Sequence, residues 1–203
     1  MIKLLKPTLF VAALLPAASL ARRLYDADLG VNPAETLQLE TGIWTLRFLI
    51  ASLAVTPLRR VTGWNRLIQY RRMVGLFAFF YGVLHFFSYL ALDQAFSLDG
   101  MLADVAKRPF ITAGFVAFVA MVPLAITSTK GWIRRLGRRW QRLHRLVYLT
   151  AAAGAVHYLW KVKVIAGSPV YYAAIVAILL AFRIAWSLRA RRSTRLVLER
   201  PPA

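Results

Sequence analysis

The sequence predicts an all-α integral membrane protein, a bundle of six transmembrane helices. Hydrophobic residues make up 59% of the 203 residues, above the ~45–50% typical of globular domains. Yet 27 Lys and Arg against 8 Asp and Glu give the chain a formal charge of +19. Apolar blocks separated by charged loops reconcile these two observations, because that layout is typical of a chain that crosses a bilayer several times.

Six apolar blocks approach or reach the ~17–25 residues that a membrane-spanning helix needs. They lack the period-2 alternation of a barrel strand, which favours helices. In chain order they cover about residues 7–24, 42–58, 73–92, 110–127, 143–160 and 169–188. We expect one transmembrane domain over residues 1–203, without an internal repeat of useful length, a soluble nucleotide-binding domain or a Gly-rich phosphate loop.

The first block has a second interpretation. Lys3 and Lys6, the apolar stretch after them and the tripeptide Ser19-Leu20-Ala21 resemble a signal peptide with a small-residue cleavage site. Arg22 and Arg23 follow directly, however, and five further spans make a retained helix the natural expectation.

Charge alternates between successive loops, and this orients the bundle because short Lys- and Arg-rich loops stay cytoplasmic. Nineteen of the 27 basic residues fall on the side of the two termini, and seven of the eight acids fall on the other side. We therefore predict that both termini lie in the cytoplasm; the bacterial inner membrane as the location is implied only by the family resemblance described below. The positive charge is then a topological signal that also favours anionic lipid, rather than a sign of nucleic-acid binding. Arg183, inside the sixth span near its inner end, is explained by snorkelling to the headgroups.

Two histidines fall inside predicted spans, where an ionisable residue is costly and therefore indicates function. His85 lies about 12 residues into the third span, and His157 lies about 12 residues beyond Arg145 in the fifth. At 1.5 Å per residue, both lie roughly 18 Å from the inner boundary of a ~30 Å apolar core. Two imidazoles at one depth can serve as axial ligands of a haem iron, so we predict both as metal ligands. A proton relay and interhelical hydrogen bonding are the alternatives.

Each of these histidines has a glycine three residues before it, Gly82 or Gly154, on nearly the same helical face. A missing side chain there would let a porphyrin edge approach the backbone, so we include both in the predicted cofactor site. Glycine is also common in membrane helices and aids their packing, and the pattern alone is therefore not specific. With no cysteine in the chain, thiolate ligands and disulfides are excluded.

Four further residues are candidates for cofactor contacts. Arg47, about five residues inside the second span, could pair with a haem propionate, with snorkelling to the outer headgroups as the alternative. His144 lies 13 residues before His157, roughly 20 Å along a helix, so the two cannot serve one haem. His144 could bind an inner cofactor or simply lie in the basic interface. Arg71 and Arg72 occupy the equivalent inner depth on the third span.

Several stretches of the chain carry a family resemblance. They are RRMVGL at 71–76, LHFFSY at 84–89, KRPF at 107–110, the run from Thr127 to His144, and HYLW at 157–160 with Lys161 and Lys163. In order and spacing they resemble the MsrQ (YedZ) family of haem-binding membrane subunits, within the wider ferric-reductase-like transmembrane group.

This resemblance implies haem b and FMN as cofactors in an inner-membrane protein of six helices. It also implies a cytoplasmic NAD(P)H flavin reductase as electron donor, and a periplasmic molybdopterin subunit that repairs oxidised methionine as acceptor. By position, His85 and His157 take the family's haem-ligand roles, and His144 matches its third histidine.

The sequence thus predicts an electron-transfer subunit rather than the catalytic subunit. No carboxylate pair falls inside a span, and no Ser-His-acid arrangement suggests itself. One haem in the outer half leaves about 18 Å to the cytoplasmic face, so an inner carrier near His144 is needed. The competing functions are a stand-alone ferric reductase and a proton or solute carrier that uses the histidines as relays.

Overall fold

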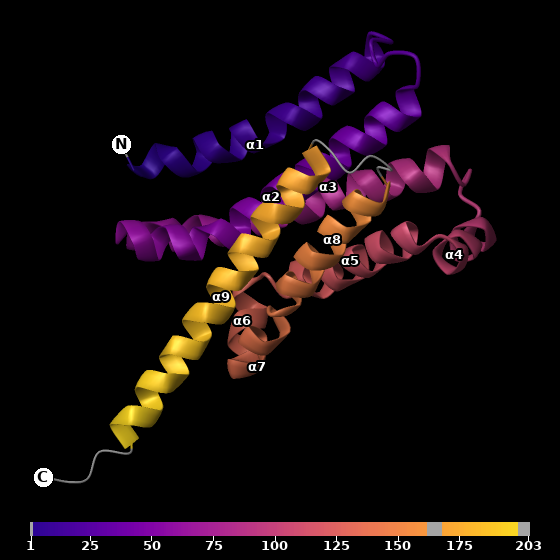
Figure 1. The fold of residues 1–203 in the computed structure, drawn as a ribbon. Helices are drawn as coiled ribbons and strands as arrows, with labels where there is room; N and C mark the ends of the chain where they lie inside the picture. The colour runs from indigo at the N-terminus through magenta and orange to yellow at the C-terminus, as the bar shows by residue number, and fades with distance from the viewer. Residues whose placement is uncertain (1, 162–167, 199–203) are drawn as a thin grey trace, which may run out of the picture.

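The computed structural model describes residues 2–161 and 168–198, and these residues form helices joined by short turns (Figure 1). The long helices are α1 (Ile2–Tyr25), α2 (Pro33–Thr62), α3 (Arg71–Leu92), α5 (Pro109–Ile126), α8 (Leu146–Lys161) and α9 (Ser168–Leu198). The short ones are the 3₁₀-helix η1 (Asn65–Tyr70), α4 (Leu98–Lys107), α6 (Lys130–Leu136) and α7 (Arg138–Leu143). The predicted all-α class is confirmed. Lys163 and Arg200, which belong to the predicted charge map, lie outside the described residues.

Five helical segments in the described ranges are long and apolar enough to cross a membrane. The sixth predicted span corresponds to α8, whose 16 residues fall just short of the usual ~17–25. It is shorter than predicted because 143–145 close α7 and the turn after it instead of opening α8. α8 nevertheless packs between α5 and α9 in the bundle, as the sequence predicts for a spanning helix.

Helix α2 extends beyond the predicted block of 42–58 at both ends because its stop signals lie outside the apolar stretch. The Asn32 side chain accepts a hydrogen bond from the Glu35 backbone N–H (3.2 Å), and Pro33 occupies the first turn. At the other end Gly63 adopts the left-handed conformation with φ 70° that terminates many helices. α4, which the apolar blocks do not predict, begins where the Ser97 hydroxyl accepts from the Gly100 N–H (3.1 Å).

Two helix pairs form the centre of the molecule. α2 packs along α3 and α5 packs along α8, while α9 lies across α8 and α2 (Figure 1). Their shared core includes Leu46, Leu49 and Leu53 of α2, packed with Ala78 and Ala151, which are fully buried. Small residues at such contacts let helix backbones approach closely, as is usual in membranes. Many large apolar side chains, in contrast, face outward, as expected of a surface in contact with lipid.

Helix α1 flanks the bundle and is tied to it by Tyr81 of α3. The Tyr81 hydroxyl donates to the Ala13 carbonyl (2.8 Å) and accepts from the Ala17 N–H (3.1 Å). These two groups would otherwise bond to each other within α1, so the hydroxyl is inserted into the helix beside Pro16. α1 is thereby fixed to α3 by a buried polar contact as well as by apolar packing.

Candidate cofactor site

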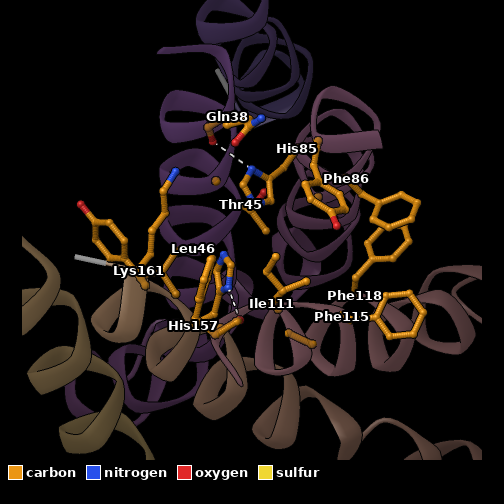
Figure 2. A pocket seen from close by; sticks show the side chains of 18 of the residues that line it. Gln38, Thr45, Leu46, His85, Phe86, Ile111, Phe115, Phe118, His157 and Lys161 are labelled. Atoms are coloured by element: carbon orange, nitrogen blue, oxygen red, sulfur yellow. Dashed lines mark hydrogen bonds between the residues drawn. The ribbon is translucent and has the colours of Figure 1, made fainter. Parts of the chain in front are cut away.

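The two intramembrane histidines face one another across a pocket between α2, α3, α5 and α8. His85 comes from α3 and His157 from α8. Their ring centroids are 5.9 Å apart and their planes are inclined at 72° (Figure 2). Both line the pocket, whose walls are mostly apolar side chains such as Leu46 and Phe118. The matched depth that the sequence predicts is thus a close pairing in space.

Each ring is anchored through Nδ1 to a backbone carbonyl of the neighbouring helix. His85 Nδ1 lies 2.9 Å from the Gln38 oxygen, and His157 Nδ1 lies 2.6 Å from the Phe110 oxygen (Figure 2). A carbonyl can only accept, so Nδ1 carries the proton in both rings and the lone pair is on Nε2. Neither Nε2 has a hydrogen-bond partner among the described residues. This is the arrangement in which an imidazole is oriented by its second nitrogen to bind a metal with its first.

Two glycines that the sequence analysis missed make room for these rings. A Cβ at Gly42 of α2 would lie 3.0 Å from His85 Cε1, and one at Gly114 of α5 would lie 2.7 Å from His157 Nδ1. A side chain at either position would displace the imidazole and stretch its bond to the carbonyl one turn earlier. The signal that could have found them is their equal separation in sequence from the histidine that each one faces.

The site is built twice from the same kind of helix pair, and one constant separation in sequence relates the two halves. The separation between His85 and His157 recurs in ten further pairs of lining residues, and Asp93, Val105, Arg108 and Thr150 alone stand outside these pairs. Further examples are Gln38 with Phe110, Gly42 with Gly114, Gly82 with Gly154, and Tyr89 with Lys161.

In each half the first helix supplies the carbonyl and the glycine, and the second helix supplies the histidine. The expectation that the chain has no useful repeat is therefore wrong for the pocket. The repeat there is spatial and retains few residue types, so it is hard to recognise from the sequence alone.

This donor set fits a haem. A metal–imidazole bond measures about 2 Å, so two rings bound on opposite sides of one ion have centroids about 6 Å apart once each nitrogen-to-centre distance is added. The observed 5.9 Å matches that arrangement. Two nitrogens are too few for an ordinary four-coordinate ion, and the described residues contain no cluster of three or more metal-binding side chains. A metal held here needs ligands beyond these two nitrogens, and the apolar walls suit a macrocycle that supplies them.

The predicted glycines and Arg47 lie differently around the pocket. Gly82 and Gly154 both line it, although a Cβ at Gly82 would meet Met121 Cε at 2.8 Å, whereas one at Gly154 would meet nothing closer than 4.0 Å. Arg47 is exposed and outside the pocket lining. Its Nε donates to the Tyr172 hydroxyl at 2.8 Å.

Two other cations line the pocket instead of Arg47, and the sequence analysis did not single them out as site residues. Lys161 is half-buried at the end of α8, one turn after His157, and extends along the pocket toward Gln38 (Figure 2). Lys161 has no carboxylate partner among the described residues. Arg108, at the junction of α4 and α5, lines the same pocket and pairs through Nε with Asp104 (3.2 Å). Both lie where cationic side chains can receive a cofactor's carboxylates.

His144 lies apart from this pocket, at the other end of α8. Its Nε2 is 3.1 Å from the Thr127 hydroxyl, and its ring stacks on Trp140 with centroids 3.8 Å apart. The Thr127 hydroxyl already donates to the Pro123 carbonyl (2.6 Å), so it accepts from His144 Nε2–H. Burial, and then the positive charge of Arg71, lower the pKa of His144 below its ordinary value of 6.5. Arg72, next to Arg71 at the start of α3, is exposed.

Comparison with a protein-family model identifies the class of membrane protein. A family model described as the ferric reductase like transmembrane component matches residues 41–155, which include His85 and both glycines nearest the histidine rings and end just before His157. No solved structure matches the chain.

Curated relatives are more specific. A protein of Herminiimonas arsenicoxydans is 53% identical over 191 residues, 93% of this chain and 88% of the relative. A Rhodospirillum rubrum protein is 49% identical over 187 residues, 92% of this chain and 90% of the relative. Both are named protein-methionine-sulfoxide reductase heme-binding subunit MsrQ. The chain belongs to the ferric-reductase-like transmembrane family and, within it, to the MsrQ family. This membership supports a role in membrane electron transfer.

Proposed function

We propose that this chain binds one haem b between His85 and His157 and serves as the membrane electron-transfer subunit of a methionine sulfoxide reductase system. The observation that carries the proposal is the pair of imidazoles 5.9 Å apart, each with Nδ1 bound to a backbone carbonyl. When bound there, haem supplies a one-electron carrier inside the bilayer. The names of the relatives support the same assignment.

The protein residues have separate tasks in this proposal. The Gln38 and Phe110 carbonyls hold the proton of each imidazole on Nδ1, which leaves the Nε2 lone pair for the cofactor. Lys161 and Arg108 receive the propionates, and the apolar walls exclude water, which stabilises a buried carrier against exchange with solvent. In this proposal the chain contributes binding, orientation and electrostatics.

The charge map supports a topology, and the family resemblance supports a direction of electron transfer across it. We propose that both termini face the cytoplasm of a bacterial inner membrane and that the pocket lies nearer the periplasm. Electrons then come from a cytoplasmic NAD(P)H flavin reductase, with FMN as the carrier at the inner end near His144. They leave to a periplasmic molybdopterin subunit that reduces methionine sulfoxide.

The test is the visible and electron paramagnetic resonance spectrum of the purified, detergent-solubilised protein. We expect a low-spin bis-imidazole haem that is lost in His85→Ala and in His157→Ala, while both variants still insert into the membrane. His144→Ala is the matched control and should keep the spectrum, because its ring lies outside the pocket. An unchanged spectrum and full haem content in either pocket variant would show that the ligand assignment is wrong.

A second measurement separates the partners. Dithionite-reduced protein in vesicles should be reoxidised by a periplasmic methionine sulfoxide reductase with substrate, and much more slowly by ferric citrate outside. Faster oxidation by ferric iron, with no response to the reductase, would favour a stand-alone ferric reductase. A protein without haem would favour a relay or carrier role for the histidines.

A further inference from the structure

Three arginines converge at the end of the bundle opposite the acidic loops. Arg60 lies two residues before the end of α2, Arg71 opens α3, and Arg183 lies at the middle of α9. Arg183 is close enough to repel both Arg60 and Arg71 electrostatically. Three helices that are separate in sequence therefore bring like charges together at one place.

Aromatic side chains hold this cluster in position. The Arg183 guanidinium carbon lies 5.4 Å from the ring centroid of Tyr148 on α8. The Arg60 guanidinium carbon lies 4.3 Å from the ring of Trp186, one turn further along α9. Arg60 and Arg71 both lie within electrostatic reach of the Tyr148 hydroxyl. Tyr148 is thus the common neighbour of the three guanidinium groups, and cation–π contacts fix two of the arginines.

The described part of the chain supplies no anion to balance these charges. Its ion pairs involve Asp26, Glu40 and Asp104, which all belong to the opposite end of the bundle. The Arg183 Nε–H is buried and has no acceptor among the described residues. A buried donor of this kind costs free energy unless something accepts from it, and an arginine that merely snorkels would turn this group toward water.

We infer that Arg60, Arg71 and Arg183 form a binding site for a phosphate group. Guanidinium groups bind phosphate oxygens through paired, charge-assisted hydrogen bonds, and a phosphate monoester brings about −1.5 to −2 charges and three acceptor oxygens. A single carboxylate offers less charge and fewer acceptors to three guanidinium groups. Phosphate occurs at a membrane surface in two forms, a soluble phosphate monoester and the singly charged phosphodiester of an anionic phospholipid headgroup.

The site lies beside His144, since the Arg71 charge acts on that ring. If the phosphate is that of FMN, the inference rests on the proposed function and places the flavin at the inner end of the path. If the phosphate belongs to a lipid, the site stands independently of the electron path.

The experiment uses the full-length haem-loaded protein in detergent after exhaustive removal of lipid. FMN and riboflavin, which lacks the phosphate, are titrated by flavin fluorescence, and phosphatidylglycerol and phosphatidylcholine are compared by native mass spectrometry. Arg60→Gln, Arg71→Gln and Arg183→Gln are the test variants. Arg66→Gln is the matched control, because Arg66 is an exposed residue of η1 on the same side. The haem spectrum of each variant reports folding.

We expect each test variant to bind the phosphate-bearing probe about tenfold more weakly, because it loses one charge-assisted hydrogen bond. The affinity of Arg66→Gln should equal that of the parent. Tighter binding of FMN than of riboflavin identifies a soluble phosphate as the ligand. Tighter binding of phosphatidylglycerol than of phosphatidylcholine, with no preference for FMN over riboflavin, identifies a lipid headgroup. Equal binding by parent and all three variants, or equal weakening in Arg66→Gln, would overturn the inference. If a glutamine variant loses its haem spectrum, the arginine at that position is replaced by lysine instead, which keeps the charge but lacks the two-pronged guanidinium group. Unweakened binding of the phosphate-bearing probe by that lysine variant counts against the site. A missing haem spectrum in the parent would instead count against the proposed function.

Discussion

The fit between His157 and Gly114 predicts a strong effect of a single methyl group. In Gly114→Ala the new Cβ would lie 2.7 Å from His157 Nδ1, 2.9 Å from Cε1 and 3.1 Å from Cγ. An ordinary contact begins at 3.4 Å, so the ring must move by more than half an ångström away from α5. That movement stretches the 2.6 Å bond from Nδ1 to the Phe110 carbonyl, which fixes the orientation of the imidazole.

Loss of such an orienting bond to a metal-binding histidine weakens metal affinity by about 10- to 100-fold. We expect Gly114→Ala to lower haem affinity within that range. Gly42→Ala should have a smaller effect, because its Cβ would approach His85 only to 3.0 Å and the ring need move by less than half an ångström. Haem titration of the apoprotein measures both affinities, and the electron paramagnetic resonance spectrum reports whether the axial ligand field has changed.

Gly75→Ala is the matched control on α3. Its Cβ would meet Ser52 Oγ at 3.5 Å, an ordinary contact, and alanine suits a helix interior better than glycine. Its haem affinity should equal that of the parent. If Gly114→Ala also bound haem with parental affinity and an unchanged spectrum, His157 would not be held as the structure indicates. An effect of Gly42→Ala larger than that of Gly114→Ala would contradict the order of these distances.

Three shorter predictions follow from other parts of the structure. Lys161→Gln should lower haem affinity, and Lys161→Arg should restore it, because Lys161 lines the pocket. Arg47→Gln should leave haem affinity unchanged, because Arg47 binds Tyr172 outside the pocket. Haem titration of the three variants measures these affinities. The pKa of His144 is lower in the folded than in the unfolded chain, so the unfolded state binds more protons below pH 6.5 and stability should fall on acidification there. Thermal melts at several pH values should show this dependence in the parent and lose it in His144→Gln. A cysteine at position 35, in a chain without native cysteine, should react with an impermeant maleimide from the periplasm before the inner membrane is permeabilised, and reaction only afterwards would reverse the topology.

The fold class and the level of the histidines could be predicted because both depend on signals close in sequence. Apolar blocks of spanning length define the long helices, and counting along each block places His85 and His157 at one depth. The ends of the helices were harder to predict from the sequence. Caps such as Asn32 and Gly63 lie outside the apolar blocks, and the short helix α4 depends on Ser97 and on packing against α5.

The partners of the histidines could not be predicted, because they come from other helices. Gly42 and the Gln38 carbonyl belong to α2, whereas His85 belongs to α3, and a backbone carbonyl has no sequence signal. Depth alone made Arg47 a candidate for a cofactor's carboxylates, but depth does not specify which face of the helix turns inward. Lys161 turns into the pocket and Arg47 turns toward Tyr172.

Among the described residues, the repeated helix pair brings two imidazoles face to face at one end of the bundle and not at the other. The separation in sequence that relates His85 to His157 also relates Arg72 to His144. The pairing of like residues therefore holds at the level of His85 and His157 and fails at the level of His144, where a second pair of imidazoles would be needed for a second haem of this kind. At that level His144 is bound to Thr127 and stacked on Trp140, and arginines take the place of a second histidine. In the proposed electron path, a carrier at the His144 end is therefore held by charge rather than by two metal bonds, and this is the chemistry that Arg60, Arg71 and Arg183 offer.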